Sequence, residues 1–522
     1  MRLSLNRVSC LLFAGVLLSA PLGAQDRHPP TEAEIDALAE KTMAAFNVPG
    51  IAIGIVKDGE VIHAKGYGVR TYGESTPVNA QTLFQIASNT KAMTAAALAI
   101  LMDDGLLTWN DKVTQHIPEF RMHGDYVSQE FTIMDLLTHR SGLPLGAGDL
   151  LFFPNGNGTV EDVINALPHL KPATSFRSEY AYDNLLYVLA GEIVARVSGM
   201  PFANFVEDRI FAPLGMTGCV GSHVNVPEGA NEATPHAVID GTIKAVAFAD
   251  EAAGTEGAGG VNCNIDGLLK WHRLQLNHGQ MENGEWLFSK ERHGEMWTPR
   301  TITRVSPPST PGEAVDISLY GLGWGIRNFM DHQMISHSGG LLGMVTFNAL
   351  IPEQNLGIVI LTNQFNGSFQ AVLSELLSGY LDHAEDMDFE ARAAQSKQGN
   401  DGGVEEMAKL WADRSDVSQP SLPLGEYAMT YADAWYGNVT IALADDGLRF
   451  ISARDPDLKG SLRHFNGNTF VVEWDDRAIM ADAYLTFELT EAGAVDRITM
   501  AKFDPRTDFS FDFWDLDLRP VK

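Results

Sequence analysis

Apolar β-type runs at the two ends of a long first region are the feature that most constrains the fold. Residues 50–68 are typical of a hairpin that turns at Lys57–Gly59. Two more strands are expected at Met344–Ile351 and Leu356–Thr362. The sequence between these pairs is mostly of helical or loop type. It therefore predicts an α/β (α+β) domain that ends near residue 385, with a helical insertion between the outer strands of its sheet.

The sequence changes character after this domain. Residues 386–420 have the composition of a linker, in which two helical stretches, 389–396 and 404–411, are interrupted by the glycines of 399–403. Residues 421–522 then carry short β-rich runs separated by turn sequences, which predicts a small all-β barrel or sandwich. The expected strands are Asn438–Leu443, Leu448–Ser452, Thr469–Trp474, Ala483–Leu489 and Ile498–Phe503.

Charge narrows the choice of partners. The chain has 37 Lys+Arg against 67 Asp+Glu, a net charge of −30, and 45% hydrophobic residues. Nucleic acids and anionic membranes bind through Lys and Arg, so neither is an expected partner. The hydrophobic content also excludes a disordered chain. A large globular enzyme is the class that remains.

The first 24 residues predict export. Arg2 and Arg7 precede an apolar stretch, Leu11–Leu18, and small residues lead up to Ala24. This pattern is typical of a secretory signal peptide, with cleavage expected after Ala24. No later apolar run reaches about 18 residues, so no integral membrane segment is expected in the mature chain. The protein is expected to be periplasmic or secreted.

Two cysteines of the mature chain would then lie in an oxidising compartment. Cys219 and Cys263 could pair there, although two cysteines alone leave the pairing open. Neither these residues nor the histidines have the spacing of a metal site, so no metal and no cofactor are expected.

Ser88 and Lys91 open a helical stretch that is apolar nearly all round. A separation of three residues puts the hydroxyl and the amine on one helical face. The helix N-terminus supplies N–H groups where an oxyanion would form, and a desolvated lysine can accept the serine proton. The alternative is a capping Ser88 with a surface Lys91. The apolar flanks 83–87 and 95–102 oppose that alternative, but these residues alone leave both interpretations open.

Two further segments place polar groups beside expected helix or strand ends. Tyr182 precedes the helical stretch 185–197, and a phenol near an ammonium has a lowered pKa and can relay protons. Asn184 could bind either a substrate carbonyl or Lys91. Residues 337–340 offer a histidine that titrates near neutral pH and two glycines that permit close approach of a ligand to the backbone. Each segment alone also fits an ordinary cap or turn.

Taken together, these three segments resemble the motifs of a known family of enzymes. The order and wide separation of Ser88-x-x-Lys91, Tyr182-x-Asn184 and His337–Ser338–Gly339–Gly340 resemble the penicillin-recognising serine hydrolases. That family includes class C β-lactamases, D-Ala-D-Ala carboxypeptidases, D-aminopeptidases and β-lactamase-like esterases. The resemblance covers about residues 32–380. Further marks are Thr132–Pro144, Pro213–Met216 and Tyr320–Trp324.

The resemblance implies a fold for both parts of the chain. It implies a β-lactamase/DD-peptidase-like catalytic domain, which is an antiparallel sheet with a helical domain. The tail, with Tyr436–Val439 and Leu462–Phe465, looks like the small lipocalin-like barrel appended to some of these hydrolases. The expected division is therefore a signal peptide at 1–24, a hydrolase domain at 25–385, a helical linker at 386–420 and a barrel at 421–522.

The resemblance also implies roles for residues. Ser88 would be the nucleophile, Lys91 its base, Tyr182 the proton relay and His337 an electrostatic partner. Asn184 would bind substrate or lysine. The N–H groups of Ser88 and Gly340 would form the oxyanion hole, with Ser338 and Gly339 beside the substrate. Many relatives that act on penicillin have Lys where this chain has His337, so strong β-lactamase activity is not expected.

The expected function is therefore an exported serine hydrolase that cleaves amide bonds of peptides, including peptides with D-residues, through an acyl-enzyme on Ser88. Carboxylic ester hydrolysis and weak β-lactamase activity are enzymatic alternatives. A peptidoglycan- or peptide-binding protein that has kept the fold is the non-enzymatic alternative. The partner is a small-molecule or peptide substrate, and a homo-oligomer is left open.

Overall fold

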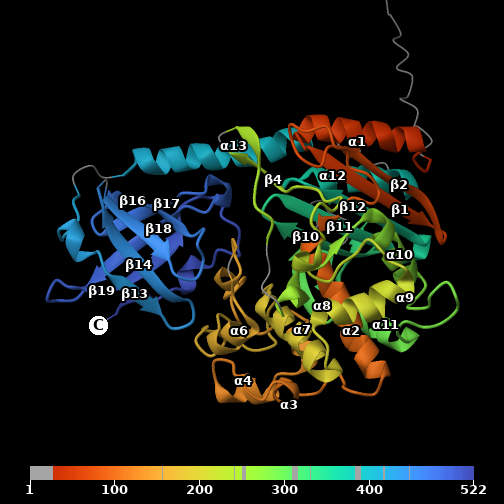
Figure 1. Cartoon of the computed structure of the whole chain (residues 1–522), viewed down its shortest axis with the longest axis horizontal. Coiled ribbons are helices and arrows are strands. Elements are labelled where there is room, and N and C mark those ends of the chain that lie inside the picture. Colours follow the sequence, from red (N-terminus) through yellow and green to blue (C-terminus); the bar gives the residue numbers. More distant parts are fainter. Residues whose placement is uncertain are drawn as a thin grey trace, which may run out of the picture.

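The computed structural model describes residues 28–155, 157–239, 241–249, 254–307, 316–329, 331–381, 389–414, 418–445 and 447–521. The predicted signal peptide, residues 1–24, lies outside these residues. Figure 1 shows a mixed α/β domain on one side and a barrel on the other, with the helix α13 (Phe389–Ala412) lying across both. The expected fold class of the chain is confirmed.

An antiparallel sheet of eight strands forms the frame of the first domain, in the order β2-β1-β12-β11-β10-β9-β8-β7. The strands are β1 (Gly50–Lys57), β2 (Glu60–Gly68), β7 (Thr301–Ser306), β8 (Asp316–Tyr320), β9 (Gly325–Phe329), β10 (His332–Leu341), β11 (Met344–Ile351) and β12 (Leu356–Thr362). The strands predicted at the two ends of the domain pair with each other, with Ile53 opposite Ile360, a pairing that the sequence analysis did not specify. The pairing of β9 with β10 ends at Ser336, so the following residues of β10 have no ladder partner on that side among the described residues.

Helices cover both faces of this sheet (Figure 1). On one face α1 (Glu32–Phe46) and α12 (Ser368–Tyr380) pack over an apolar cluster that contains Ile51 and Ile358. On the other face α10 (Ile265–Leu276) packs against β1 and β12 and leads into the helical insertion. The other helices of the insertion are α2 (Thr90–Asp103), α3 (Val113–His116), α4 (Asp125–Glu130), α5 (Ile133–Leu136), α6 (Val160–Ala166), α7 (Leu185–Ser198), α8 (Phe202–Val206), α9 (Ala212–Leu214) and α11 (Lys290–Met296).

The helix α2 lies at the centre of the insertion. Every residue from Thr90 to Leu101 is buried, as its all-round apolar sequence predicts. A short strand, β3 (Phe84–Gln85), leads into this helix and pairs with β6 (Asn262–Cys263). A second short pair, β4 (His236–Ile239) and β5 (Thr242–Ala245), lies at the cavity described below.

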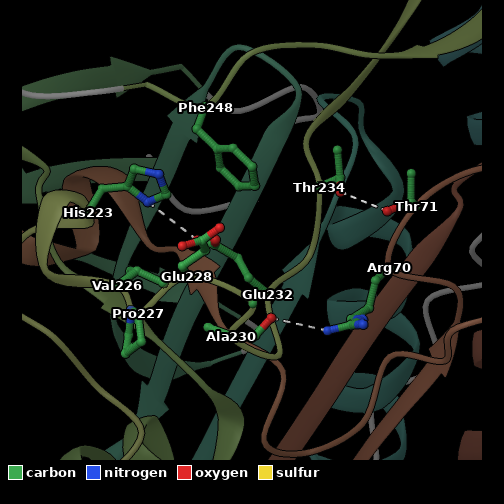
Figure 2. Close-up of a pocket in the computed structure, with 11 residues that line it drawn as sticks. Arg70, Thr71, His223, Val226, Pro227, Glu228, Ala230, Glu232, Thr234 and Phe248 are labelled. Carbon is green, nitrogen blue, oxygen red and sulfur yellow. Dashed lines mark hydrogen bonds and ion pairs between the residues drawn. The ribbon is translucent and has the colours of Figure 1, made fainter.

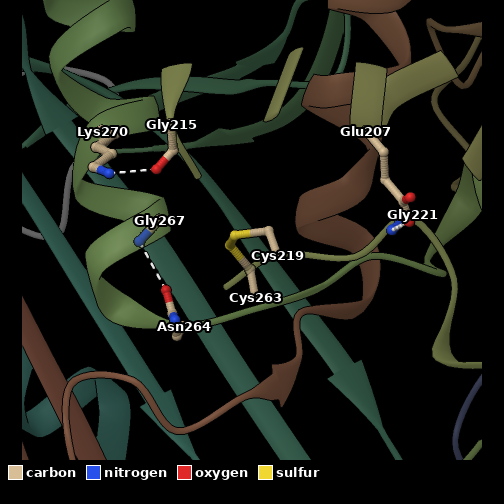
Figure 3. The surroundings of a disulfide bond; sticks show 8 residues. All are labelled: Glu207, Gly215, Cys219, Gly221, Cys263, Asn264, Gly267 and Lys270. Carbon is tan, nitrogen blue, oxygen red and sulfur yellow. Dashed lines mark hydrogen bonds between the residues drawn. A yellow bond between two sulfur atoms is a disulfide. The ribbon is translucent and has the colours of Figure 1, made fainter. Parts of the chain in front are cut away.

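The structure joins Cys219 and Cys263 by a disulfide (Figure 3). Helix α10 passes directly beside it, because a Cβ at Gly267 would lie 2.3 Å from the sulfur of Cys219. The Asn264 side chain accepts a hydrogen bond from the Gly267 N–H at 2.8 Å and thereby caps this helix. The bond therefore braces β6, whose partner β3 leads to the turn that carries Ser88.

The second domain is a nearly closed antiparallel barrel of eight strands, in the order β19-β18-β17-β16-β15-β14-β13-β20. The strands are β13 (Thr430–Asp433), β14 (Gly437–Ala444), β15 (Gly447–Ser452), β16 (Lys459–Asn466), β17 (Thr469–Trp474), β18 (Ala483–Leu489), β19 (Val495–Lys502) and β20 (Arg519–Pro520). Ile498 and Leu518 bridge β19 to the residues before β20, which nearly closes the barrel. Five of these strands match predicted runs, whereas β13, β16 and β20 were not predicted.

The segment between the domains differs from the prediction. Two helical stretches broken at residues 399–403 were expected, but α13 runs unbroken over 24 residues. A glycine inside a helix costs about 1 kcal/mol relative to alanine, so local propensity favours a break here. The helix nevertheless continues and packs against α1 and α12, and a Cβ at Gly403 would lie 2.6 Å from Cγ of Arg506 in the barrel domain. The glycine thus lets the helix pass close to the barrel.

Within these described ranges, no single helix is long and apolar enough to cross a membrane. The segments Leu185–Ser198 and Phe202–Leu214, bent by 74°, meet the criteria of length and composition only as a pair.

Candidate active site

Ser88 lies on a single 3-10 turn, Ala87–Asn89, that leads into α2. Ala87 has a φ of +48°, a backbone conformation that non-glycine residues rarely adopt. Strand β10 approaches this turn so closely that a Cβ at Gly339 would lie 2.0 Å from the carbonyl oxygen of Ile86. The same oxygen accepts a hydrogen bond from Oγ1 of Thr346 on β11, at 3.0 Å. Gly339 therefore serves the approach of the protein's own turn to the sheet, whereas the sequence suggested the approach of a ligand.

Lys91 lies one helical turn after Ser88 and is fully buried. Its Nζ is 2.9 Å from Oγ of Ser88, 2.7 Å from Oδ1 of Asn184 and 2.7 Å from the carbonyl oxygen of Ala258. Each of these three acceptors is uncharged, and burial penalises a charged amine. Of the two roles expected for Asn184, the structure shows contact with Lys91. The surface location for Lys91 that the capping alternative requires is wrong.

Tyr182 hydrogen-bonds to Ser88 through its side chain, but the lowered pKa that the sequence predicted for its phenol is wrong. Burial raises the pKa of Tyr182 well above its ordinary value, and the hydrogen bond to Ser88 offsets this only in part. Nζ of Lys91 lies 4.8 Å from the centroid of the Tyr182 ring, over the aromatic face. Tyr182 is therefore a neutral phenol that keeps its proton near neutral pH.

His337 is also neutral, in contrast to the sequence-based expectation. Burial lowers the pKa of His337 to about 3, and Lys91 beside it adds to this lowering whenever its amine is protonated. Its Nδ1 lies 2.6 Å from the carbonyl oxygen of Ser338, so Nδ1 carries the proton and donates it. Nε2 is then an acceptor for the hydroxyl of Tyr320, at 2.9 Å. His337 thus orders the edge of β10 and supplies no positive charge for a substrate.

The low pKa of His337 predicts a dependence of stability on pH. Its folded pKa is below the unfolded value of 6.5, so the unfolded chain binds the proton first and stability is lost as pH falls from 6.5 toward 3. Between pH 7 and pH 5 this group should remove about 2 kcal/mol from the free energy of unfolding. His337→Gln should abolish that share of the slope in urea titrations, whereas His28→Gln, at an exposed position, should keep it. Equal slopes in the wild type and His337→Gln would contradict the assignment.

Two backbone N–H groups border the cavity at the nucleophile. That of Ser88 lies at the entrance to α2. Leu341 and Met344 close a two-residue turn between β10 and β11, and hydrogen-bonded and non-bonded pairs alternate along such a ladder. The N–H of Gly340 therefore points away from β11, toward the open edge of β10. These are the two groups predicted to form the oxyanion hole.

A cavity of about 1480 Å³ contains this site and is lined by both domains. The first domain contributes Ser88, Tyr182 and the segment 336–343. The barrel domain contributes residues 508–511, which lie between β19 and β20. The ring of Phe509 meets that of Tyr182 edge to face, with centroids 5.8 Å apart. The barrel therefore supplies one wall of the candidate active site.

The same barrel segment is bound to the first domain by a buried carboxyl group. Asp512 accepts hydrogen bonds from the N–H of Gly148 at 2.6 Å and from that of Leu150 at 3.0 Å. Between these two residues, Asp149 accepts a hydrogen bond from Nδ2 of Asn184 at 2.8 Å. Asn184 in turn accepts from Lys91. A continuous chain of contacts thus runs from the barrel to the amine beside the nucleophile.

Comparison with known proteins shows to which family a chain with this site belongs. The model of the Beta-lactamase family matches residues 35–377. The chain belongs to the Beta-lactamase family. A second model, a domain of unknown function (DUF3471), matches residues 413–520, which contain the barrel.

Relatives of this β-lactamase-family protein include a protein named as a hydrolase. It is 26% identical over 440 residues to the Unguisins hydrolase of Aspergillus campestris, covering 80% of this chain and 79% of that one. It is 28% identical over 355 residues to Protein flp of Staphylococcus aureus, covering 67% of this chain and 66% of that one, just under two thirds. The β-lactamase-family protein is a serine hydrolase.

A solved structure shares the fold. The octameric penicillin-binding protein homologue from Pyrococcus abyssi superposes with a TM-score of 0.58 and 20% sequence identity. The match covers 93% of this chain and 99% of that chain, so the likeness includes the two-domain arrangement.

Several groups of the site in this β-lactamase-family hydrolase were missed by sequence reasoning. Asp149 and Asp183 are fully buried close to Lys91, and burial raises the pKa of Asp183 to about 7. His139 is fully buried too, with its ring 4.2 Å from that of Tyr182, and its Nδ1 accepts a hydrogen bond from the N–H of Asp183. The motif Thr132–Pro144 marks His139 in the sequence and the motif Tyr182-x-Asn184 contains Asp183, but nothing local marks Asp149.

A second, smaller cavity of about 330 Å³ is lined by Arg70, Thr71, Phe248 and residues between His223 and Thr234 (Figure 2). Its polar groups bind one another: His223 lies 3.3 Å from Glu232, and the hydroxyls of Thr71 and Thr234 are 2.8 Å apart. The guanidinium of Arg70 donates to the carbonyl of Ala230. These contacts indicate a structural role. Across the described part of the chain, no group of three or more His, Cys, Asp or Glu side chains could hold a metal ion.

Proposed function

We propose that this hydrolase cleaves amide bonds of peptides, including peptides with D-residues, through a covalent acyl-enzyme on Ser88. The convergence of two groups on one oxygen carries the proposal: Nζ of Lys91 lies 2.9 Å from Oγ of Ser88, and the phenol of Tyr182 hydrogen-bonds to the same residue. A hydroxyl between an amine and a neutral phenol has one group to take its proton and one to give a proton to the leaving group.

The acylation step follows from these positions. Oγ of Ser88 attacks the carbonyl carbon of the substrate while its proton passes to Nζ of Lys91. The N–H groups of Ser88 and Gly340 stabilise the oxyanion of the tetrahedral intermediate. The bond from carbon to nitrogen then breaks, and the leaving amine takes a proton from Tyr182, which recovers it from Lys91. The amine of Lys91 and the phenol of Tyr182 end the step as they began.

Deacylation repeats the same transfers with water. A water molecule loses a proton to the Lys91–Tyr182 pair as its oxygen attacks the acyl carbon. The bond to Oγ breaks, Ser88 recovers its proton, and the carboxylic acid product leaves. The cavity of about 1480 Å³ has room for several residues of an extended peptide, and β10 beyond Ser336 offers an unpaired edge beside it.

The neutral state of His337 separates this proposal from a β-lactamase. A β-lactam carries a carboxylate close to its scissile bond, and a neutral imidazole with its Nδ1 proton bound to Ser338 offers that group no charge. The same neutrality suits carboxylic esters, which are the second candidate substrates.

We also propose that the chain acts after export, in a periplasm or outside the cell. A disulfide between Cys219 and Cys263 supports this, since such bonds persist in oxidising compartments. The predicted signal peptide at residues 1–24 agrees with it. The octameric assembly of the Pyrococcus abyssi relative makes a homo-oligomer a reasonable expectation, which sedimentation velocity would test.

Ser88→Ala tests the mechanism. The wild type should hydrolyse members of a panel of D- and L-aminoacyl amides and short esters, and Ser88→Ala should lose at least about 10³-fold in kcat while keeping its thermal unfolding profile. Ser374→Ala, on α12 at the far face of the sheet, is the matched control and should retain wild-type rates. Equal turnover by Ser88→Ala and the wild type would refute the mechanism.

An acylating active-site probe gives a second readout of the same proposal. Mass spectrometry should find the adduct on Ser88 in the wild type and none in Ser88→Ala. The intact mass of chain recovered after export should also correspond to a start at Gln25. An adduct on another residue would contradict the role of Ser88. A recovered chain that still begins at Met1 would contradict cleavage of the signal peptide.

A further inference from the structure

The part of the cavity where the two domains meet is apolar. The first domain lines it with Leu145, Phe152, Phe153 and Pro154, and the barrel domain lines it with Phe509 and Phe511. Leu145 is 44% exposed and Phe509 is only partly buried, so both present apolar surface to the cavity. Ligand sites are typically lined by side chains of this kind. We call the space between these six residues the junction pocket.

Contacts between the domains hold the walls of the junction pocket together. A Cβ at Gly146 would lie 2.6 Å from the carbonyl oxygen of Phe509 and 2.9 Å from Cδ2 of its ring. At the other end of this loop, the N–H of Asn155 donates to the carboxyl group of Asp455 in the barrel domain, at 3.2 Å. The two walls are therefore held against each other, and neither domain forms the pocket alone.

The junction pocket begins one side chain away from the nucleophile. The ring of Phe509 meets that of Tyr182 at a centroid distance of 5.8 Å, and Tyr182 hydrogen-bonds to Ser88. The N–H of Gly146, the residue after Leu145, donates to the carbonyl oxygen of Tyr182 at 2.9 Å. Consecutive Cα atoms of a peptide are about 3.8 Å apart. The residues that directly flank the scissile bond are therefore the ones whose side chains reach this pocket.

Charge disfavours an acidic side chain in the junction pocket. None of its six residues ionises. Asp508, the residue before Phe509, is exposed and lines the cavity, and its carboxylate accepts from the N–H of Ser510 at 3.0 Å. Arg506 is bound to Asp504 at 2.6 Å. An acid would therefore lose water and meet a like charge, whereas an apolar side chain gains free energy by leaving water.

We propose that the junction pocket binds a large apolar side chain, aromatic or branched aliphatic, of a residue that directly flanks the scissile bond. The inference rests on the proposed function, and it adds a substrate class: peptides with such a side chain next to the bond that is cleaved. Leu145 and Phe509 contact this side chain away from the reacting atoms, so they determine specificity and take no part in proton transfer. The barrel domain thereby helps to select the substrate.

Two series of peptides test this. One series varies only the residue directly before the scissile bond, and the other only the residue directly after it, among Phe, Leu, Ala and Glu. In one of the two series the wild type should favour Phe over Ala by about 10- to 100-fold in kcat/KM, because burying a phenyl ring is worth this much, and Glu should be the poorest. Phe509→Ala and Leu145→Ala should each lower that Phe/Ala ratio by about 3- to 10-fold and leave the ratio in the other series unchanged.

Trp514→Ala is the matched control, because this exposed aromatic residue lies in the same barrel segment and does not line the cavity. It should keep the wild-type ratio, and Phe509→Leu should keep part of it. Absence of a preference for Phe from both series would overturn the inference. An equal loss for the Phe and Ala members in Phe509→Ala would overturn it too, because Phe509 would then only support Tyr182.

Binding to Ser88→Ala keeps this inference apart from the proposed function. Calorimetric titration with the same peptides should give the Phe member a Kd about 10-fold lower than the Ala member, and the double variant Ser88→Ala/Phe509→Ala should lose this difference. If the wild type cleaves neither amides nor esters but the binding preference is present, the acyl-enzyme mechanism fails and the junction pocket stands. If peptides are cleaved without a preference in rate or in binding, the junction pocket fails and the mechanism stands.

Discussion

Lys91→Met should lower kcat/KM by about 10²- to 10⁴-fold, because it removes the group that accepts the proton of Ser88. Methionine fills similar volume and carries no proton acceptor of comparable basicity. Stability should change little, since two effects oppose each other. A fully buried amine is removed, which relieves its desolvation, whereas Asn184 and the carbonyl of Ala258 lose a donor.

Steady-state kinetics and urea unfolding, run on the same preparation, check this result. Lys270→Met is the matched control, because Lys270 is partly buried in α10 and donates to the carbonyl of Gly215 away from Ser88. It should retain wild-type kcat/KM within about twofold. If Lys91→Met kept more than a tenth of wild-type activity, Lys91 would not be the base.

Asp512→Ala should impair both stability and catalysis, although Asp512 belongs to the barrel domain. Its carboxyl group is fully buried and accepts from the N–H groups of Gly148 and Leu150. Losing this acceptor leaves two buried donors unsatisfied, which should cost about 2–4 kcal/mol in the free energy of unfolding. The turn that carries Asp149 would shift, and a shift of about 1 Å in the contacts of Lys91 should lower kcat by about 10- to 100-fold.

Two further variants, Asp512→Asn and Asp496→Ala, show whether the effect on kcat depends on the contacts of Asp512. The asparagine keeps one acceptor oxygen, so its kcat should fall between those of the wild type and Asp512→Ala. Asp496 lies on β19 of the same domain, is exposed, and should tolerate alanine without a change in kcat. A loss of stability in Asp512→Ala with an unchanged kcat would show that the contact holds the domains together and does not position Lys91.

Local patterns in the sequence were enough to predict the frame of the fold. The hairpin β1–β2 and the strands β11 and β12 were predicted because apolar runs and turn residues mark them. Strand β7 was missed because only one of its six residues is buried and it carries no apolar run. The unbroken helix α13 was missed for a different reason: its glycines signal a break locally, and its packing against α1, α12 and the barrel domain joins segments that are distant in the sequence.

The features of the candidate site also divide into those that local sequence predicts and those that depend on packing between distant segments. Ser88 and Lys91 could be predicted because a spacing of three on a helix is a local property. The ionisation of Tyr182 and His337 could not, because burial sets both pKa values and burial depends on packing between distant segments. Asp512 could not be found at all from local sequence. Its contact with Gly148 joins residues 364 positions apart, and nothing near either residue signals it.

The place of that contact in the chain has a consequence for biosynthesis. A ribosome makes the segment 503–518 after every other part of the cavity wall, and the barrel must close before Phe509 and Asp512 can reach the hydrolase domain. Domains generally fold as units, the N-terminal one first. A nascent chain therefore holds its nucleophile in an unfinished cavity, and full activity begins only after the second domain has folded onto the first.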